Sequence, residues 1–167
     1  CVSQRACVYC GARVVLNPIT DALHLVHGPI GCASYTWDIR GSLSSGEELF
    51  RNSFSTDMQD SDVVFGGEKK LELAIKEAVE IFKPKAITIS ATCPVGLIGD
   101  DINAVAAKAQ KTYGIPVLAF SCEGYKGVSQ SAGHHIANNK LMKDVNKAVD
   151  EFVKSDKYNE LKTKWGC

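Results

Sequence analysis

Cysteine is the residue type of this chain best suited to chemistry, and the sequence holds seven cysteines. An odd number of widely spaced cysteines argues against a framework of disulfides, and 167 residues can bury a core without covalent crosslinks. If the thiols are reduced, each is a packing residue, a reactive nucleophile, or a ligand of a metal ion or an iron–sulfur cluster. The seven are Cys1, Cys7, Cys10, Cys32, Cys93, Cys122 and Cys167.

Cys7 and Cys10 form a CxxC pair, which alone is typical of a thioredoxin-like redox pair or of half a zinc ribbon. A zinc ribbon needs a second CxxC, and the sequence has none. A thioredoxin-type motif opens a helix after a strand, whereas here the apolar run that ends at Leu16 lies after the cysteines. Neither interpretation fits the sequence well.

The elements that position these thiols are those of an α/β domain. Short apolar runs alternate with amphipathic stretches, which predicts a three-layer, Rossmann-like fold with a mostly parallel sheet. Strands are predicted at residues 12–16, 24–27, 62–65, 86–91 and 115–120.

The clearest helix is predicted over Glu68–Phe82, where apolar residues recur at i, i+3, i+4 and i+7. A second helix is predicted from about residue 101 to residue 113, before Gly114. Residues 41–59 are rich in Ser, Gly and Asn and predict a long irregular connection, a kind of loop that is often functional. A charged helical stretch is predicted from Asn139 onward.

The chain as a whole is predicted to hold an α/β domain over residues 1–139 and a charged helical tail over residues 140–167. Its 19 basic and 19 acidic residues balance, which argues against a dedicated nucleic-acid binder. The longest apolar runs are far shorter than the roughly 18 residues that span a bilayer. No signal peptide is visible at the start.

Three cysteines follow predicted strands and are expected to meet at one edge of the sheet. They are Cys32, Cys93 and Cys122, and ligands of open α/β sheets bind outside the carboxyl ends of the strands. Three thiolates are one fewer than a cubane iron–sulfur cluster takes, so Cys7 or another chain would have to complete the set. Nearby glycines leave room for a bulky ligand, although a buried cysteine in an ordinary turn explains the same pattern.

Histidine, glutamine and arginine side chains offer further candidates. His134 and His135 are adjacent, so on a helix they point about 100° apart and at most one of them reaches a given ligand. Gln130 lies one turn before His134, and the pair could hydrogen-bond a bound group, with a structural histidine an equally good interpretation. Arg40 begins the irregular loop and could face an anion or be a surface residue. Structural roles are expected for His24 and His27.

Taken together, five ordered segments resemble the nitrogenase component 1 family, which includes catalytic molybdenum–iron protein subunits and scaffold proteins that mature the iron–molybdenum cofactor. The resemblance spans residues 1 to about 139, its N-terminal domain only. The segments are Cys7–Gly11, His24–Cys32, Phe65–Lys70, Cys93–Asp101, and Cys122–Gly124 continuing through Gly133–Asn138.

The resemblance implies that Cys7, Cys32 and Cys93 bind an iron–sulfur cluster, of 4Fe-4S or P-cluster type, shared with a homologous partner subunit. Cys10 and Cys122 do not match family ligands, so the CxxC is interpreted as a coincidence of spacing.

The resemblance also implies that the residues matching the family's cofactor pocket surround the iron–molybdenum cofactor or its precursor; they are Arg40, Gln130 and His134. It further implies a heterotetramer, an ATP-dependent iron-protein reductase as partner, and a cytoplasmic location without nucleic acid or membrane.

The segment Ser34–Gly46 resembles the scaffold branch, the NifE type, more than the catalytic subunit. A scaffold for cofactor biosynthesis is therefore our first hypothesis. A catalytic nitrogenase-type oxidoreductase subunit that reduces dinitrogen, or a metal-free interaction domain, are the alternatives. Family members have three α/β domains, and the Cys and His that anchor their cofactor lie beyond the matched segments. We therefore expect a fragment or a stand-alone first domain.

Overall fold

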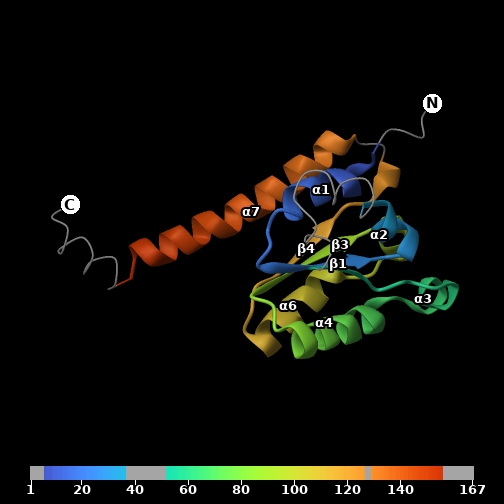
Figure 1. Cartoon of the computed structure of the whole chain (residues 1–167), viewed down its shortest axis with the longest axis horizontal. Coiled ribbons are helices and arrows are strands. Elements are labelled where there is room, and N and C mark those ends of the chain that lie inside the picture. Colours follow the sequence, from blue (N-terminus) through green and yellow to red (C-terminus); the bar gives the residue numbers. More distant parts are fainter. Residues whose placement is uncertain (1–5, 37–51, 127–128, 156–167) are drawn as a thin grey trace.

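The computed structural model describes residues 6–36, 52–126 and 129–155. Four parallel strands form one sheet in the order β2-β1-β3-β4. Helices cover both of its faces, as Figure 1 shows. This arrangement confirms the predicted three-layer α/β fold with a parallel sheet. The strands are β1 (Ala22–His27), β2 (Ser53–Ser55), β3 (Ala86–Ala91) and β4 (Val117–Ser121).

Each face of the sheet carries its own apolar core. Leu25 and Ile89 belong to the core beneath α4 (Glu68–Phe82) and α6 (Ile102–Tyr113). Phe120 belongs to the opposite core, beneath α1 (Val8–Leu16) and α7 (Gln130–Val153). Because side chains alternate along a strand, a central strand such as β1 contributes to both cores and is buried throughout.

Several elements lie where the sequence pattern predicts them. Helix α4 and strand β3 have the predicted bounds, and α4 buries its apolar stripe. The carboxylate of Asp101 accepts hydrogen bonds from the backbone nitrogens of Asn103 and Ala104 and so begins α6. Gly114, at a φ of 69°, ends that helix in the left-handed region that suits glycine.

Two predicted strands are wrong, because both segments are helices. Residues 12–16 belong to α1, whose buried stripe includes Val8, Ala12 and Leu16 at helical spacing. Residues 62–65 belong to α3 (Asp60–Phe65), which begins with a capping box between Gln59 and Asp62. Short apolar runs with β-branched residues do not separate strand from helix by periodicity alone.

The predicted irregular connection over 41–59 contains the short strand β2, which pairs with β1 at the edge of the sheet. Residues 41–51 of this predicted connection lie outside the described part of the chain. Helix α7 begins at Gln130 and continues across residue 139, so the division into two parts at that position stays a prediction. No helix of the described residues is long and apolar enough to cross a membrane.

Three short helices lie at the carboxyl end of the sheet. They follow β1, β2 and β3 in the chain, as expected for a parallel sheet whose strands all end on one side. A 3-10 turn, η4 (Gly124–Lys126), follows β4 at the same edge. The helices are α2 (Ile30–Thr36), α3 and α5 (Cys93–Ile98).

Candidate functional site

The three cysteines predicted as cluster ligands lie on three elements at the carboxyl end of the sheet. Cys7 is the exposed residue that precedes α1. Cys32 lies in α2, directly after β1, and Cys93 opens α5, directly after β3. Because β1 and β3 are neighbours in the sheet, these two half-buried thiols come from adjacent strand ends.

Gly124 holds the space between Cys7 and Cys93. Its backbone nitrogen donates a hydrogen bond to Sγ of Cys93 at 3.1 Å. A β-carbon at this position would lie 3.2 Å from Cβ of Cys7, 3.8 Å from its Sγ, and 3.5 Å from Sγ of Cys93. The two thiols therefore face a common point from either side of a residue without a side chain. In the sequence Gly124 stands out only as part of a segment that resembles the family, because no spacing rule distinguishes such a glycine.

The thiols differ in their acidity. A hydrogen bond with the Cys10 side chain is the largest effect on Cys7, and it lowers the pKa of that thiol to about 6. Burial raises the pKa of Cys32, and the neighbouring Cys93 and Cys7 raise it further. All three sulfurs thus lie within electrostatic range of one another. A bound cation would reverse the effect of that mutual repulsion and favour the thiolates.

Cysteine thiols of this kind are ligands that an iron–sulfur cluster takes. Within residues 6–36, 52–126 and 129–155, no group of three or more His, Cys, Asp or Glu side chains is placed to hold one ion. In a cluster each cysteine binds a different iron atom, so its thiols need not converge on one point. Cys7 and Cys93 beside Gly124, with Cys32 within electrostatic range of both, would suit such a larger group.

Cys10 and Cys122 are buried and belong to the core beneath α1 and α7. Their positions agree with the structural roles expected for them. Cys10 nevertheless lies close to the proposed ligands, with its Sγ 3.8 Å from Sγ of Cys7. The strand predicted after the CxxC is wrong, because α1 begins directly after Cys7, and no strand of the described residues precedes that helix.

The residues predicted to surround a larger cofactor are described in part. Gln130 is the first residue of α7, and His134 lies one turn later. Nε2 of His134 is shielded from solvent and has no hydrogen-bond partner among the described residues. An unpartnered buried ring nitrogen is unusual, and a bound group would satisfy it. His135 is exposed, and Arg40 lies outside the described residues.

Two glycines set the position of these α7 residues against α1. A β-carbon at Gly11 would lie 1.9 Å from the carbonyl oxygen of Gln130. One at Gly133 would lie 1.9 Å from the carbonyl oxygen of Val8. The two helices are therefore in backbone contact, which only glycine permits. Figure 1 shows α1 lying along the first part of α7.

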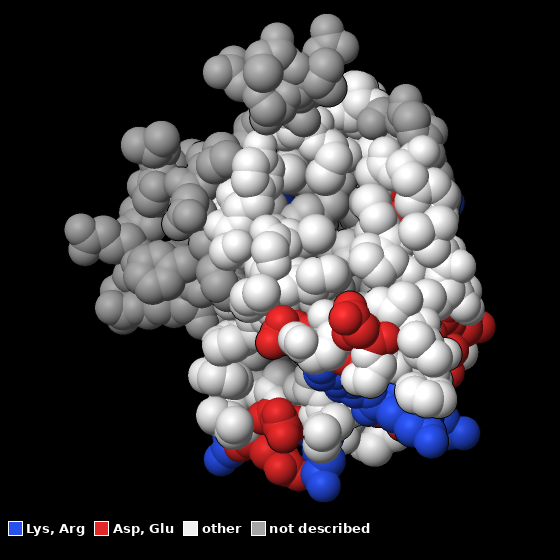
Figure 2. Space-filling model, turned by 90° about the vertical axis from the view of Figure 1, so that its right-hand side faces the viewer, with Lys and Arg blue, Asp and Glu red and all other residues white. Residues whose placement is uncertain are grey.

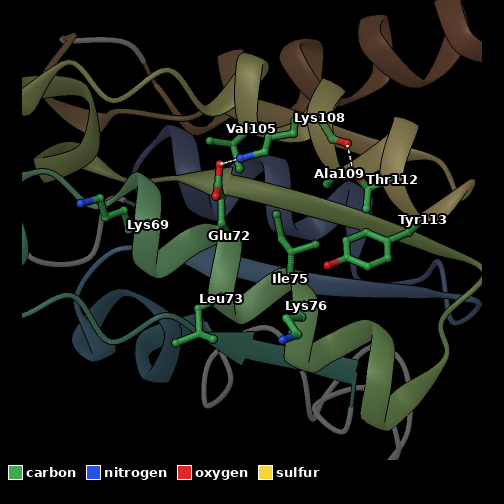
Figure 3. Close-up of a pocket in the computed structure, with 10 residues that line it drawn as sticks. All are labelled: Lys69, Glu72, Leu73, Ile75, Lys76, Val105, Lys108, Ala109, Thr112 and Tyr113. Carbon is green, nitrogen blue, oxygen red and sulfur yellow. Dashed lines mark hydrogen bonds and ion pairs between the residues drawn. The ribbon is translucent and has the colours of Figure 1, made fainter.

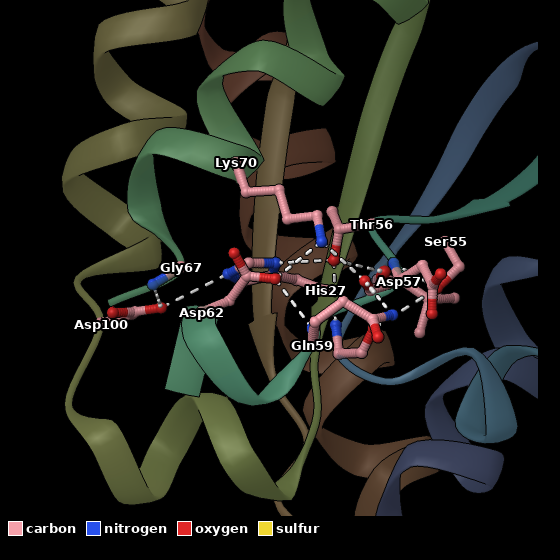
Figure 4. A network of polar contacts seen from close by, with 11 residues as sticks. His27, Ser55, Thr56, Asp57, Gln59, Asp62, Gly67, Lys70 and Asp100 are labelled. Atoms are coloured by element: carbon pink, nitrogen blue, oxygen red, sulfur yellow. Dashed lines mark hydrogen bonds and ion pairs between the residues drawn. The ribbon is translucent and has the colours of Figure 1, made fainter. Parts of the chain in front are cut away.

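A network of polar contacts lies where β1 ends (Figure 4). His27 is fully buried, and its Nδ1 lies 3.0 Å from Oγ1 of Thr56. Its Nε2 is 3.5 Å from Oδ2 of Asp100, within ion-pair distance but without hydrogen-bond geometry. The same carboxylate accepts a hydrogen bond from the backbone of Gly67 at 2.9 Å.

Burial is the main effect on His27 and lowers its pKa, with Asp100 acting in the opposite direction. These contacts join β1 to the residues around α4 and α5. The other predicted structural histidine, His24, is also buried, with its Nδ1 2.7 Å from Oγ1 of Thr88. Both histidines thus have partners within the sheet and its surroundings.

A groove of about 340 Å³ lies between α4 and α6, away from the cysteines (Figure 3). Glu72 and Lys108 form an ion pair of 2.7 Å across it. Its lining has no cysteine or histidine, and its only carboxylate is paired in this way. The groove therefore contains none of the candidate ligands, which lie at the carboxyl end of the sheet.

A sequence model of the nitrogenase component 1 type oxidoreductases matches residues 7–161. The chain belongs to the nitrogenase component 1 family. The match begins at the first proposed ligand and continues beyond residue 139, into the segment predicted as a tail.

Relatives in the family carry two kinds of name at similar identity. The chain is 64% identical to the nitrogenase iron–molybdenum cofactor biosynthesis protein NifE of Clostridium pasteurianum, over 91% of this chain and 33% of that protein. It is 61% identical to the nitrogenase molybdenum–iron protein alpha chain of the same organism, over 86% of this chain and 28% of that protein. The chain thus spans a third or less of the length of these relatives.

A solved structure, nitrogenase Cp1 at pH 5, shares the fold. It superposes with a TM-score of 0.76 at 60% sequence identity and covers 84% of this chain and 30% of the other. These findings confirm the predicted family and fold. Overall identity does not separate the scaffold branch from the catalytic branch, because both match about equally well.

Proposed function

We propose that this chain supplies Cys7, Cys32 and Cys93 as thiolate ligands to an iron–sulfur cluster shared with a homologous partner subunit, in a protein that assembles the nitrogenase cofactor. The observation that supports it most directly is the placement of Cys7 and Cys93 beside Gly124, with Cys32 within electrostatic range of both. Three cysteines are fewer than the four that a cubane cluster takes, so a second subunit completes the set.

The surface beside the cysteines supports a protein partner. Figure 2 shows the side of the molecule on which α2 and α3 lie, largely uncharged in its upper part. Large apolar side chains are exposed on the elements around it, including Val64 at 73%, Phe65 at 88% and Leu97 at 71%. Exposed apolar side chains in such number mark interaction surfaces. A partner that covers them would also exclude water from the cluster.

The residues of this chain have separate roles in that proposal. The cysteines hold the cluster, which supplies electron transfer when bound. The Gly124 N–H that donates to Sγ of Cys93 stabilises negative charge on that sulfur. The buried Nε2 of His134, with Gln130 on the same helix face, would hydrogen-bond a cofactor or its precursor. Arg40, which lies outside the described residues, is given the same role because it matches the family's cofactor pocket.

Analysis of iron and acid-labile sulfide tests the cluster. The chain is purified without oxygen together with a homologous partner subunit, and Cys→Ser variants are made at positions 7, 32 and 93. Each is expected to lose a large part of its iron. Cys122→Ala is the matched control, because that thiol is buried in the core and is expected to leave the iron content unchanged. Unchanged iron in all three variants would overturn the assignment.

The scaffold role is separated from catalysis by two assays on the same complex. Transfer of a cofactor precursor to a cofactor-free component 1, without reduction of substrate in the presence of the ATP-dependent reductase, is expected of a scaffold. Reduction of dinitrogen would instead favour the catalytic alternative. A colourless complex without iron would favour the metal-free interaction domain.

A further inference from the structure

The cluster-site thiol Cys7 has a second thiol beside it that the proposed ligand set does not use. Cys10 lies one helical turn along α1, and its Sγ is 3.8 Å from Sγ of Cys7. Cys7 is exposed and Cys10 is 1% exposed. An oxidant in solution can therefore reach the first sulfur and not the second.

The backbone around the pair allows a bond between the two sulfurs. Cys7 stands at the N-cap with extended backbone angles, φ −81° and ψ 178°, so its side chain is not confined by a preceding helical turn. A disulfide needs its sulfurs about 2.05 Å apart, so they must approach by about 1.8 Å. Because Cys7 is exposed and Cys10 is buried, we expect rotation of the Cys7 side chain to supply that approach.

We propose that Cys7 and Cys10 form a reversible disulfide when no cluster is bound, and that this bond closes the cluster site by removing Cys7 from its ligands. The closing of the site rests on the proposed function, whereas the disulfide itself does not. No such pairing follows from the family ligands, since Cys10 is not among them.

The reaction is a thiol–disulfide exchange with a small-molecule disulfide such as oxidised glutathione. The Cys7 thiolate attacks one sulfur of glutathione disulfide, the bond between the two glutathione sulfurs breaks, and one glutathione thiol leaves. Cys10 then loses its proton and attacks Sγ of Cys7, which releases the second glutathione thiol. The protein thiols give up two electrons and two protons, and glutathione disulfide is reduced to two thiols.

One peptide reports the reaction. Trypsin cleaves after Arg5 and Arg13 and yields Ala6–Arg13, which contains Cys7 and Cys10 and no other cysteine. The cluster-free chain is treated with oxidised glutathione, alkylated in denaturant and digested with trypsin. The mass of the peptide is then measured by mass spectrometry. The expected product is a peptide that has lost two hydrogens and takes up no alkyl group, and that regains both alkylation sites after reduction. A peptide with two alkyl groups, with glutathione attached, or linked to the peptide of Cys93 would overturn the proposal.

Cys10→Ala is the matched variant. It keeps the exposed thiol and removes the one that resolves it, so the Cys7–glutathione mixed disulfide is expected to accumulate in the variant and not in the unaltered chain. The main readout is made on the unaltered chain, so it stands even if the variant folds poorly. Equal accumulation in both proteins would show that Cys10 does not react.

Iron uptake tests the closing of the site. The oxidised chain with its partner subunit is expected to take up less iron and sulfide than the reduced one, and a dithiol reductant should restore uptake. A disulfide that leaves uptake unchanged would overturn this part of the proposal. Failure of the proposed function has a different signature: the reduced chain takes up no iron, or Cys7→Ser leaves uptake unchanged, while the peptide mass still reports the disulfide.

Discussion

Gly133→Ala tests the contact between α1 and α7, because two physical effects predict opposite signs for it. Replacement of Gly by Ala within a helix stabilises by about 1 kcal/mol where there is room for the methyl group. Here the new β-carbon would lie 1.9 Å from the carbonyl oxygen of Val8 and 2.6 Å from the backbone nitrogen of Ala12. Both are backbone atoms of α1, so no side-chain rotation relieves the clash.

The magnitude can be worked from these distances. Real β-carbons stay at least 3.0 Å from such atoms, so α7 must move from α1 by about 1.1 Å at this point. Overpacking costs about 1–3 kcal/mol, and the upper end is expected where backbone must shift. After the helix-propensity gain, the free energy of unfolding should fall by about 2 kcal/mol. For a chain of this size that lowers Tm by roughly 4–8 °C.

Thermal unfolding of the reduced, cluster-free chain, followed by far-ultraviolet circular dichroism, measures the effect. Gly31→Ala is the matched control, because it also lies in a helix and its β-carbon would meet no atom within 4 Å. Its Tm should be unchanged or slightly higher. A Gly133→Ala protein as stable as the unaltered chain, or more so, would refute backbone contact between the two helices.

Three further predictions follow from other contacts. Gly124→Ala should lower the iron content of the complex with little change in helix signal, because the methyl group would stand between Cys7 and Cys93. Asp101→Ala should lower the free energy of unfolding by about 1 kcal/mol, because α6 loses its N-cap. Asp101→Asn should retain most of the stabilisation by the cap, and urea unfolding measures both variants. Burial lowers the pKa of His24 to about 4, below the unfolded value of about 6.5, so the unfolded chain binds the extra proton. Stability should therefore fall as the pH drops from about 6.5 to about 4, by up to about 1.4 kcal/mol per pH unit, with a smaller slope in His24→Asn.

Each of these has an outcome that contradicts it. Full iron content in Gly124→Ala would show that the space around the glycine is not needed for a cluster. Equal urea midpoints for the Ala and Asn variants at position 101 would show that the cap does not hold α6. Identical pH slopes with and without His24 would place the titrating group elsewhere.

The local sequence pattern was sufficient to predict an element and its bounds where one physical signal dominated. The apolar stripe of Glu68–Phe82 has a helical period over four turns, and the run of residues 86–91 is buried on both sides, so both elements were predicted with their observed bounds. The segments 12–16 and 62–65 were predicted wrongly, because a few consecutive apolar residues have no measurable period. In the first, the helix is selected by packing against α7, a segment more than a hundred residues away in the chain.

The sequence by itself determined the family, the α/β fold and the set of candidate ligands, because these depend on residue identities and their order along the chain. Only the tertiary structure decided which groups meet. It placed Gly124 between Cys7 and Cys93, brought Gly133 against Val8, and set the two sulfurs of the CxxC 3.8 Å apart at the start of a helix. Such contacts depend on how distant segments pack, and neither spacing nor composition encodes a distance between atoms of separate elements.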